Sequence, residues 1–228
     1  MKFGVVIFPG SNCDRDMLEA LQNNLQFETI ALWHKDKDLS AFNTDDCIVL
    51  PGGFSYGDYL RCGAIARFSP MMQSVIAFAN KGGKVLGVCN GFQILCESGL
   101  LPGVLLRNAD QQFICKNVFI KNTSDDSVLK IPVAHGEGRY FAPENVLEKL
   151  QQNDQVIYRY CDEDGNVSEE ANANGSMHNI AGICNEDANV FGMMPHPERA
   201  CSALLGNEDG IKVFDHILGL SHKGLTLV

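Results

Sequence analysis

The sequence is short of basic residues, and this shortage restricts the surfaces that the protein can bind. Its 18 Lys and Arg residues stand against 28 Asp and Glu residues, a formal net charge of -10 at pH 7. A surface this negative repels phosphate backbones and anionic lipid head groups. We therefore expect no nucleic-acid partner and no membrane-surface partner.

Other absences exclude further classes of protein. The nine cysteines are odd in number and form no C-x-x-C pair, which argues against a disulfide framework and a zinc ribbon. No run approaches the ~20 apolar residues of a membrane span, and the apolar run at 3–8 is too short for a signal peptide. No G-x-x-x-x-G-K-[ST] phosphate loop occurs. These patterns predict a cytoplasmic protein with reduced thiols and no metal site.

The composition is that of a globular protein. Hydrophobic residues make up 45% of the 228 residues and charged residues 20%, which is enough apolar surface for a core. At roughly 150 residues per domain, this length predicts a single domain over residues 1–228. The segment 221–228 has no pattern, and we expect it to be a loose tail.

Strands and helices alternate in the first half. Buried, compact apolar runs predict strands at 2–8, 27–33, 47–50 and 85–88, and periodic segments predict helices at 14–24, 70–81 and 90–98. Such alternation requires right-handed crossovers and gives a parallel sheet covered on both faces.

The second half has strand-like runs at 104–107, 113–121 and 131–134 with no long helix between them. Asp164-Gly165 predicts a hairpin between 155–160 and a strand at Val167, and a second hairpin is expected between 180–184 and 190–194. A helix is expected at 209–218. The predicted fold class is α/β: a flavodoxin-like, open, mostly parallel sheet with helices on both faces and a β-rich C-terminal half.

The segment Gly87-Val88-Cys89-Asn90-Gly91-Phe92-Gln93 carries the strongest chemical signal. A nucleophile between small residues, where a strand turns sharply into a helix, is held in a strained and exposed conformation. The amides of the helix N-terminus favour the thiolate, which is the attacking species. Most cysteines are inert and buried, and we expect this of the other eight. Cys89 is the predicted nucleophile.

A proton donor is available in Pro195-His196-Pro197-Glu198. The prolines favour an extended backbone, in which residues two apart share a face, so that Glu198 can orient the ring of His196. Backbone donors for a developing oxyanion are the amide of Asn90 and the Gly52-Gly53 turn. Gln93 lies one helical turn after Asn90 and can face the same pocket.

These residues resemble the class I (triad) glutamine amidotransferases. Further motifs narrow the resemblance to the glutaminase subunits of phosphoribosylformylglycinamidine synthase: Phe54-Ser55-Tyr56-Gly57-Asp58, Pro132-Val133-Ala134-His135-Gly136-Glu137-Gly138-Arg139, Asn174-Gly175-Ser176 and Met194-Pro195-His196-Pro197-Glu198-Arg199. The matches run from Phe8 to about Arg199, nearly the whole chain.

The resemblance implies a function and roles for the residues. Cys89 would attack glutamine, His196 would protonate ammonia and Glu198 would hold His196, while His135, Gly136 and Glu137 would bind the substrate. Ammonia would pass to a larger synthetase subunit, which makes formylglycinamidine ribonucleotide from formylglycinamide ribonucleotide and ATP in purine biosynthesis. A small bridging subunit is also implied, and ATP and Mg²⁺ are expected on the synthetase.

Two other functions remain open from the residues alone. A stand-alone cysteine hydrolase can use a similar fold, although Gln93 and the His-x-Glu order disfavour it, and a non-catalytic binding subunit is disfavoured by the intact Cys89, His196 and Glu198. Ser55, Tyr56, Asp58 and Arg61 can contact either the substrate or the partner.

Overall fold

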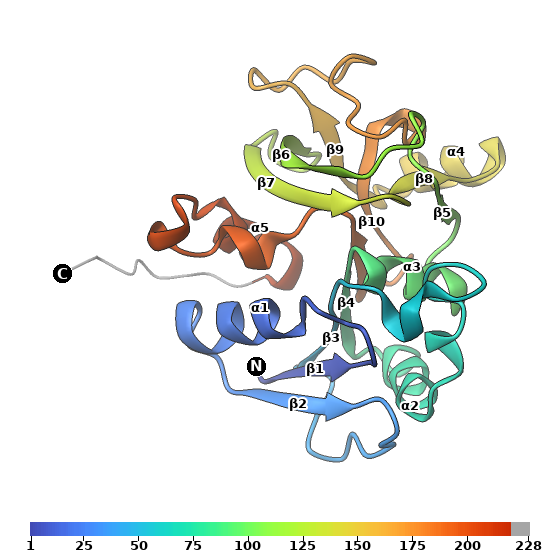
Figure 1. The fold of residues 1–228 in the computed structure, drawn as a ribbon, viewed down its shortest axis with the longest axis vertical. Coiled ribbons are helices and arrows are strands. Elements are labelled where there is room, and N and C mark those ends of the chain that lie inside the picture. Colours follow the sequence, from blue (N-terminus) through green and yellow to red (C-terminus); the bar gives the residue numbers. More distant parts are fainter. Residues whose placement is uncertain (220–228) are drawn as a thin grey trace.

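The computed structural model describes residues 1–219, so the predicted tail at 221–228 lies outside the described residues. Within this part of the chain, a nine-stranded sheet runs in the order β2-β1-β3-β4-β11-β10-β9-β6-β7, and β5 pairs with β8 in a small second sheet (Figure 1). The strands are β1 (Phe3–Ile7), β2 (Thr29–Trp33), β3 (Cys47–Leu50), β4 (Lys84–Val88), β5 (Val104–Leu106), β6 (Ile114–Asn122), β7 (Val128–His135), β8 (Arg139–Phe141), β9 (Val156–Cys161), β10 (Ile180–Cys184) and β11 (Val190–Met193).

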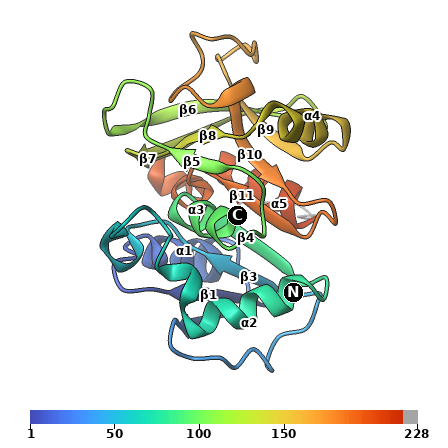
Figure 2. The same ribbon diagram turned by 90° about the vertical axis from the view of Figure 1, so that its right-hand side faces the viewer.

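The strands β2, β1, β3, β4 and β11 are all parallel. Every residue of β3 is buried, as expected for a strand covered on both faces. The helices α1 (Asp14–Glu19) and α5 (Asp209–Leu218) lie on one face, and α2 (Pro70–Ala79) and α3 (Asn90–Glu97) lie on the other (Figure 2). The carboxyl ends of the parallel strands therefore meet at one edge, where open α/β sheets bind their ligands.

The remaining strands of the large sheet are antiparallel. β10 pairs with β11 and β9, and β6 pairs with β9 and β7. The predicted hairpin at 180–184 and 190–194 is thereby confirmed. A parallel half and an antiparallel half form one sheet, and the predicted α/β fold class with a β-rich C-terminal half is confirmed.

The predicted helices are present, and local chemistry explains their limits. The hydroxyl of Ser69 accepts a hydrogen bond from the Met72 amide, and Pro70 occupies the first turn of α2. The helix expected at 14–24 is α1 followed by a π-helical segment, Ala20–Asn24. The sequence analysis missed α4 (Glu144–Gln152), although Leu147 and Leu150 have the spacing of one buried helical face.

The predicted hairpin between 155–160 and Val167 is wrong. Residues 162–166 form a closed turn, in which the Asp162 carboxylate accepts hydrogen bonds from the amides of Asp164 and Asn166 at 3.0 and 2.8 Å. Both edges of β9 are already paired, one with β6 and one with β10. A strand at Val167 has no free edge to join.

Within residues 1–219, none of the helices has the length and apolar character needed to cross a bilayer.

Candidate active site

Cys89 forms the sharp turn between β4 and α3. Its backbone has φ 52° and ψ -106°, a left-handed φ that costs a residue with a side chain roughly 1–3 kcal/mol. The Cys89 amide donates to the Met193 carbonyl at 2.8 Å, which ties the turn to the end of β11. The strained turn predicted at this cysteine is present.

The two glycines around Cys89 allow α3 to pack directly on the sheet. A Cβ atom at Gly91 would lie 1.9 Å from the Leu50 carbonyl oxygen, and one at Gly87 would lie 2.6 Å from the Gly91 oxygen. Any side chain at Gly91 would therefore push the helix away from β3. The G-x-C-x-G spacing is a packing requirement that fixes the position of Cys89, the predicted nucleophile.

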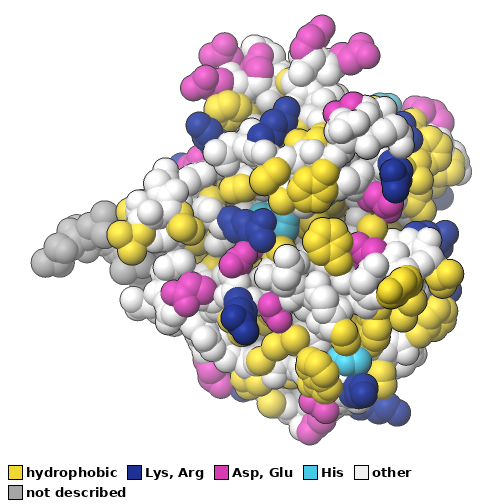
Figure 3. Space-filling view, in the orientation of Figure 1, with side chains coloured by type: hydrophobic (Ala, Val, Ile, Leu, Met, Phe, Trp, Pro, Cys, Tyr) yellow, Lys and Arg dark blue, Asp and Glu magenta, His cyan; other side chains and the backbone are white. Residues whose placement is uncertain are grey.

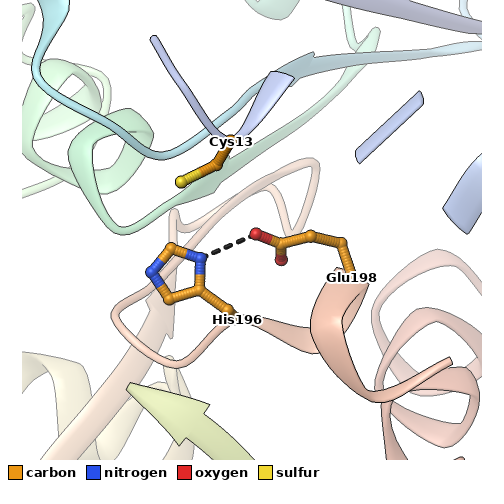
Figure 4. A group of neighbouring side chains, drawn as sticks. All are labelled: Cys13, His196 and Glu198. Carbon is orange, nitrogen blue, oxygen red and sulfur yellow. Dashed lines mark hydrogen bonds and ion pairs between the residues drawn. The ribbon is translucent and has the colours of Figure 1, made fainter. Parts of the chain in front are cut away.

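His196 and Glu198 form a buried pair after β11. Nδ1 of His196 lies 2.6 Å from Oε1 of Glu198 (Figure 4), and the two side chains are 1% and 0% exposed. The expected extended backbone is only partly present, because Pro197–Ala200 is a 3₁₀ helix. Glu198 thus reaches the ring from a helical turn. With Nδ1 occupied, Nε2 is the ring nitrogen available to Cys89.

Burial and charge act in opposite directions on His196. Burial favours the neutral ring, but the negative charges of Glu198 and of the Cys89 thiolate outweigh it and raise the pKa of His196 to about 10. The arrangement thus favours an imidazolium at neutral pH. A protonated ring beside the nucleophile is suited to give its proton to a leaving amine.

Gly52 and Gly53 lie directly against this pair. A Cβ atom at Gly52 would lie 2.7 Å from Cε1 of His196 and 3.4 Å from Cβ of Cys89, so that only glycine leaves room for the ring. Gly53 has φ 128°, and a Cβ atom there would lie 2.6 Å from the Asn12 amide nitrogen. The turn is confined between the nucleophile and the loop after β1.

The other predicted oxyanion donor is the amide of Asn90, the first residue of α3. The first amides of a helix have no acceptor within the helix. The Asn90 side chain is fully buried and joins α3 to the loop after β3: it accepts from the Ser55 amide and donates to Gln93 and Asp58, at 3.1, 2.9 and 3.1 Å. This network fixes the residue beside the nucleophile.

A cavity of about 400 Å³ opens over Cys89. Seven of the predicted residues line it: Gly53, Cys89, Gln93, His135, Gly136, Glu137 and His196. The other three, Gly52, Asn90 and Glu198, lie behind this lining and support it. Residues distant in the sequence are thus brought to one pocket at the carboxyl edge of the sheet.

The segment 135–137 is attached to the helix after the nucleophile. Nε2 of Gln93 donates to the Glu137 carbonyl at 2.6 Å. Nδ1 of His135 lies 3.0 Å from Oδ1 of Asn108, and burial, assisted by the positive charge of His196, lowers the pKa of His135 to about 4. His135 is therefore a neutral wall of the pocket.

The sequence analysis missed Cys13, which lies beside His196 and Glu198 (Figure 4). Its Sγ lies 3.1 Å from Nη2 of Arg199, whose Nε lies 2.9 Å from Asp16. Burial raises the pKa of Cys13 to about 12, so the group remains a thiol. Its position in the loop that follows the first strand, as Gly52 lies in the loop that follows β3, was the available signal.

Cys13, His196 and Glu198 are also the described residues that could ligate a metal. One ligand atom from each lies within 4.8 Å of the others. The Arg199 cation beside Cys13 disfavours a metal ion, and Glu198 is already bound to His196. The expectation of no metal stays a prediction.

The loop after β3 exposes hydrophobic side chains next to the pocket. Phe54, Tyr59 and Leu60 are 49%, 73% and 92% exposed, and hydrophobic atoms gather over this loop in the space-filling view (Figure 3). An exposed apolar patch of this kind marks an interaction surface.

Comparison with known proteins gives consistent matches along the chain. Residues 1–210 match the model of the CobB/CobQ-like glutamine amidotransferase domain. The chain is 52% identical over 228 residues to the phosphoribosylformylglycinamidine synthase subunit PurQ of Gloeobacter violaceus, covering 96% of this chain and 97% of the relative. It is 55% identical over 221 residues to the corresponding subunit of Chlorobium luteolum, covering 92% and 94%.

A solved structure agrees with these relatives. The chain matches one in the structure of PurLQS from Thermotoga maritima with a TM-score of 0.80 and 43% identity, covering 96% of this chain and 97% of that one. The chain therefore belongs to the CobB/CobQ-like glutamine amidotransferase family and, within it, to the PurQ subunits of phosphoribosylformylglycinamidine synthase.

Proposed function

We propose that this protein hydrolyses L-glutamine to glutamate and ammonia and delivers the ammonia to a larger synthetase subunit. That subunit uses ATP to convert formylglycinamide ribonucleotide into formylglycinamidine ribonucleotide in purine biosynthesis. The observation that carries the proposal is the Cys89 turn with the buried His196–Glu198 pair beside it. The PurQ relatives support the identity of the product.

The reaction begins at the side-chain amide of glutamine. The Cys89 sulfur attacks the amide carbon, a C–S bond forms, and the carbonyl electron pair moves to oxygen. The amides of Asn90 and of the Gly52-Gly53 turn donate to this oxyanion. His196 then protonates the nitrogen, the C–N bond breaks, and ammonia leaves a γ-glutamyl thioester on Cys89.

Hydrolysis of the thioester uses the same residues in reverse. The ring of His196, now neutral, takes a proton from water, and the resulting hydroxide attacks the thioester carbon. The C–S bond breaks, glutamate is released, and the Cys89 thiolate is regenerated. Glu198 holds the ring throughout and stabilises its protonated form, a role supported by the 2.6 Å contact in a buried site.

The pocket wall at Gln93, His135, Gly136 and Glu137 holds the rest of the substrate. Support for this comes from their position in the lining and from the bond between Gln93 and the Glu137 carbonyl.

The ammonia is used in a reaction on another subunit, the synthetase. We assign ATP and Mg²⁺ to the synthetase, since the sequence has no recognisable phosphate loop. A small bridging subunit completes the proposed complex, and the similarity of this chain to one in the structure of PurLQS from Thermotoga maritima supports work in a multi-subunit assembly. We also propose that the protein works in the cytoplasm, because its nine cysteines are free thiols, as is usual in a reducing compartment.

Glutamate release from glutamine tests this function directly. We would assay the wild type, Cys89→Ala and the control Cys115→Ala, each alone and with the synthetase and bridging subunits, ATP and the ribonucleotide. Cys115 is exposed and lies outside the pocket. We expect activity that requires Cys89, tolerates loss of Cys115 and increases with the partners. Absence of glutamine hydrolysis by the wild-type complex would overturn the proposal.

A further inference from the structure

Asp58 is a pocket carboxylate held only by neutral groups. Its Oδ1 accepts from Nδ2 of Asn90 at 3.1 Å, and its Oδ2 accepts from the Cys62 thiol at 3.1 Å. The Gly63 amide is a third neutral donor. Asp58 is half-buried in the lining of the cavity that contains Cys89. The residue is thus oriented by its neighbours, while its charge is not balanced by them.

Other acidic residues near the pocket form ion pairs with basic side chains, whereas Asp58 does not. Glu137, the other carboxylate of the lining, lies 3.7 Å from Arg107. Asp16 lies 2.9 Å from Arg199, and Arg61, close to Asp58 in sequence, is paired with Glu97 at 2.6 Å. Among residues 1–219, no Lys, Arg or His forms an ion pair with Asp58.

This imbalance affects the ionisation of Asp58. Burial raises the pKa of its carboxyl, the charge of Glu137 adds to the increase, and the bonds from Cys62 and Asn90 oppose it. A partly desolvated carboxylate is stabilised strongly by a cation that enters the same pocket, since charge-assisted hydrogen bonds are about twice as strong as neutral ones.

The loop that carries Asp58 is fixed in an unfavourable conformation. Asp58 has φ 51°, and Tyr56, two residues earlier, has φ 55°. The Tyr56 hydroxyl forms a hydrogen bond with the ring of the buried His34. Strain of this kind persists when the surroundings enforce it and is concentrated at ligand sites. The loop therefore presents the carboxylate in one orientation.

We propose that Asp58 binds the α-ammonium group of glutamine and so selects an α-amino acid amide over a simple carboxamide. Glutamine carries this cation at the end opposite to the amide that Cys89 attacks. Asn90 connects the two ends of the site, since its backbone follows Cys89 and its side chain holds Asp58. The proposal rests on the glutaminase function and adds the group that recognises the substrate.

The test compares glutamine with glutaramate, which has the same amide and carboxylate but no α-amino group. Asp58→Asn removes the charge and keeps the shape, and asparagine tolerates a positive φ. In the reconstituted complex, we expect the ratio of kcat/KM for glutamine to kcat/KM for glutaramate to fall by about 10- to 100-fold, the loss of one charge-assisted bond. The change should lie mainly in the KM for glutamine.

Two features keep the test decisive. A ratio of two kcat/KM values does not depend on the fraction of protein that is folded, and Ki values against glutamine give the same comparison if glutaramate turns over too slowly. The control Asp154→Asn makes the same change at an exposed residue with φ 53° and should leave the ratio unchanged. An unchanged ratio in Asp58→Asn would overturn the assignment, whereas a wild-type complex inactive on glutamine would overturn the function instead.

Discussion

Replacing Glu198 by Gln removes a charge from the proposed catalytic pair of His196 and Glu198 with little change of shape. The amide oxygen can still accept a hydrogen bond from Nδ1 of His196, which now lies 2.6 Å from Oε1 of Glu198. The charge of Glu198 is the first of the forces that overcome burial and raise the pKa of the ring to about 10 from its ordinary 6.5. In Glu198→Gln, burial is opposed only by Cys89 and by a neutral hydrogen bond, and the imidazolium loses the largest source of its stabilisation.

The size of the effect follows from the role of the proton. Positioned acid–base catalysis contributes about 10²- to 10⁴-fold to a rate, which corresponds to about 3 to 5 kcal/mol of activation free energy. We expect kcat for glutamate release to fall within this range, with a much smaller change in the KM for glutamine. The ring would be neutral when the amine has to leave.

The assay is glutamine-dependent glutamate release by the reconstituted complex. Synthesis driven by added ammonium chloride serves as the control, because it bypasses the glutaminase site and should be retained. A Glu198→Gln variant with kcat within about threefold of the wild type would refute the argument, since general acid catalysis by a stabilised imidazolium would then contribute little.

Two further predictions follow from the packing and charge around this pair. Gly52→Ala would place a Cβ atom 2.7 Å from Cε1 of His196, so the ring must move. We expect kcat for glutamate release to fall by about 10²-fold, while synthesis from added ammonium is retained. A fully active variant would contradict this packing argument. His135 binds its proton at a pKa of about 4 when folded and 6.5 otherwise, so its contribution to stability is complete above pH 6.5 and is lost as the pH falls toward 4. The wild type should therefore lose up to about 3 kcal/mol of unfolding free energy through His135 as the pH falls from 6.5 to 4, and His135→Gln should not lose this part. Urea unfolding at both pH values measures the difference, and identical pH profiles for the two proteins would refute the prediction.

Elements that depend on residues close together in the sequence were predictable, and elements that depend on distant strands were not. The helices at 70–81 and 209–218 were predictable because caps, proline and apolar spacing act within a few residues. The hairpin at Val167 failed because a turn signal does not reveal whether the neighbouring strand has a free edge. In the folded sheet, β6 and β10 occupy both edges of β9.

The residues of the candidate site were also predictable only where they depend on a short segment of the sequence. The strained turn at Cys89 follows from two glycines and a helix start in one short segment. The contact of Glu198 with His196 was also predictable, although its backbone is helical after Pro197. The surroundings of Cys13 were not predictable, because Arg199 lies far away in the sequence. Asp58 was a candidate contact from the sequence, but its place in the pocket depends on the distant Asn90 as well as on Cys62 nearby.

The sequence by itself determined the alternating α/β pattern and was enough to predict the nucleophile and its acid–base partner, since each depends on neighbouring residues. The tertiary structure alone decided how charges are compensated. Asp16 is paired with Arg199, a residue from the other end of the chain, and Asp58 is left without a cation among the described residues. The reason is physical, because Coulomb interactions and burial depend on distances in space, and the parallel sheet brings the ends of distant strands to one edge.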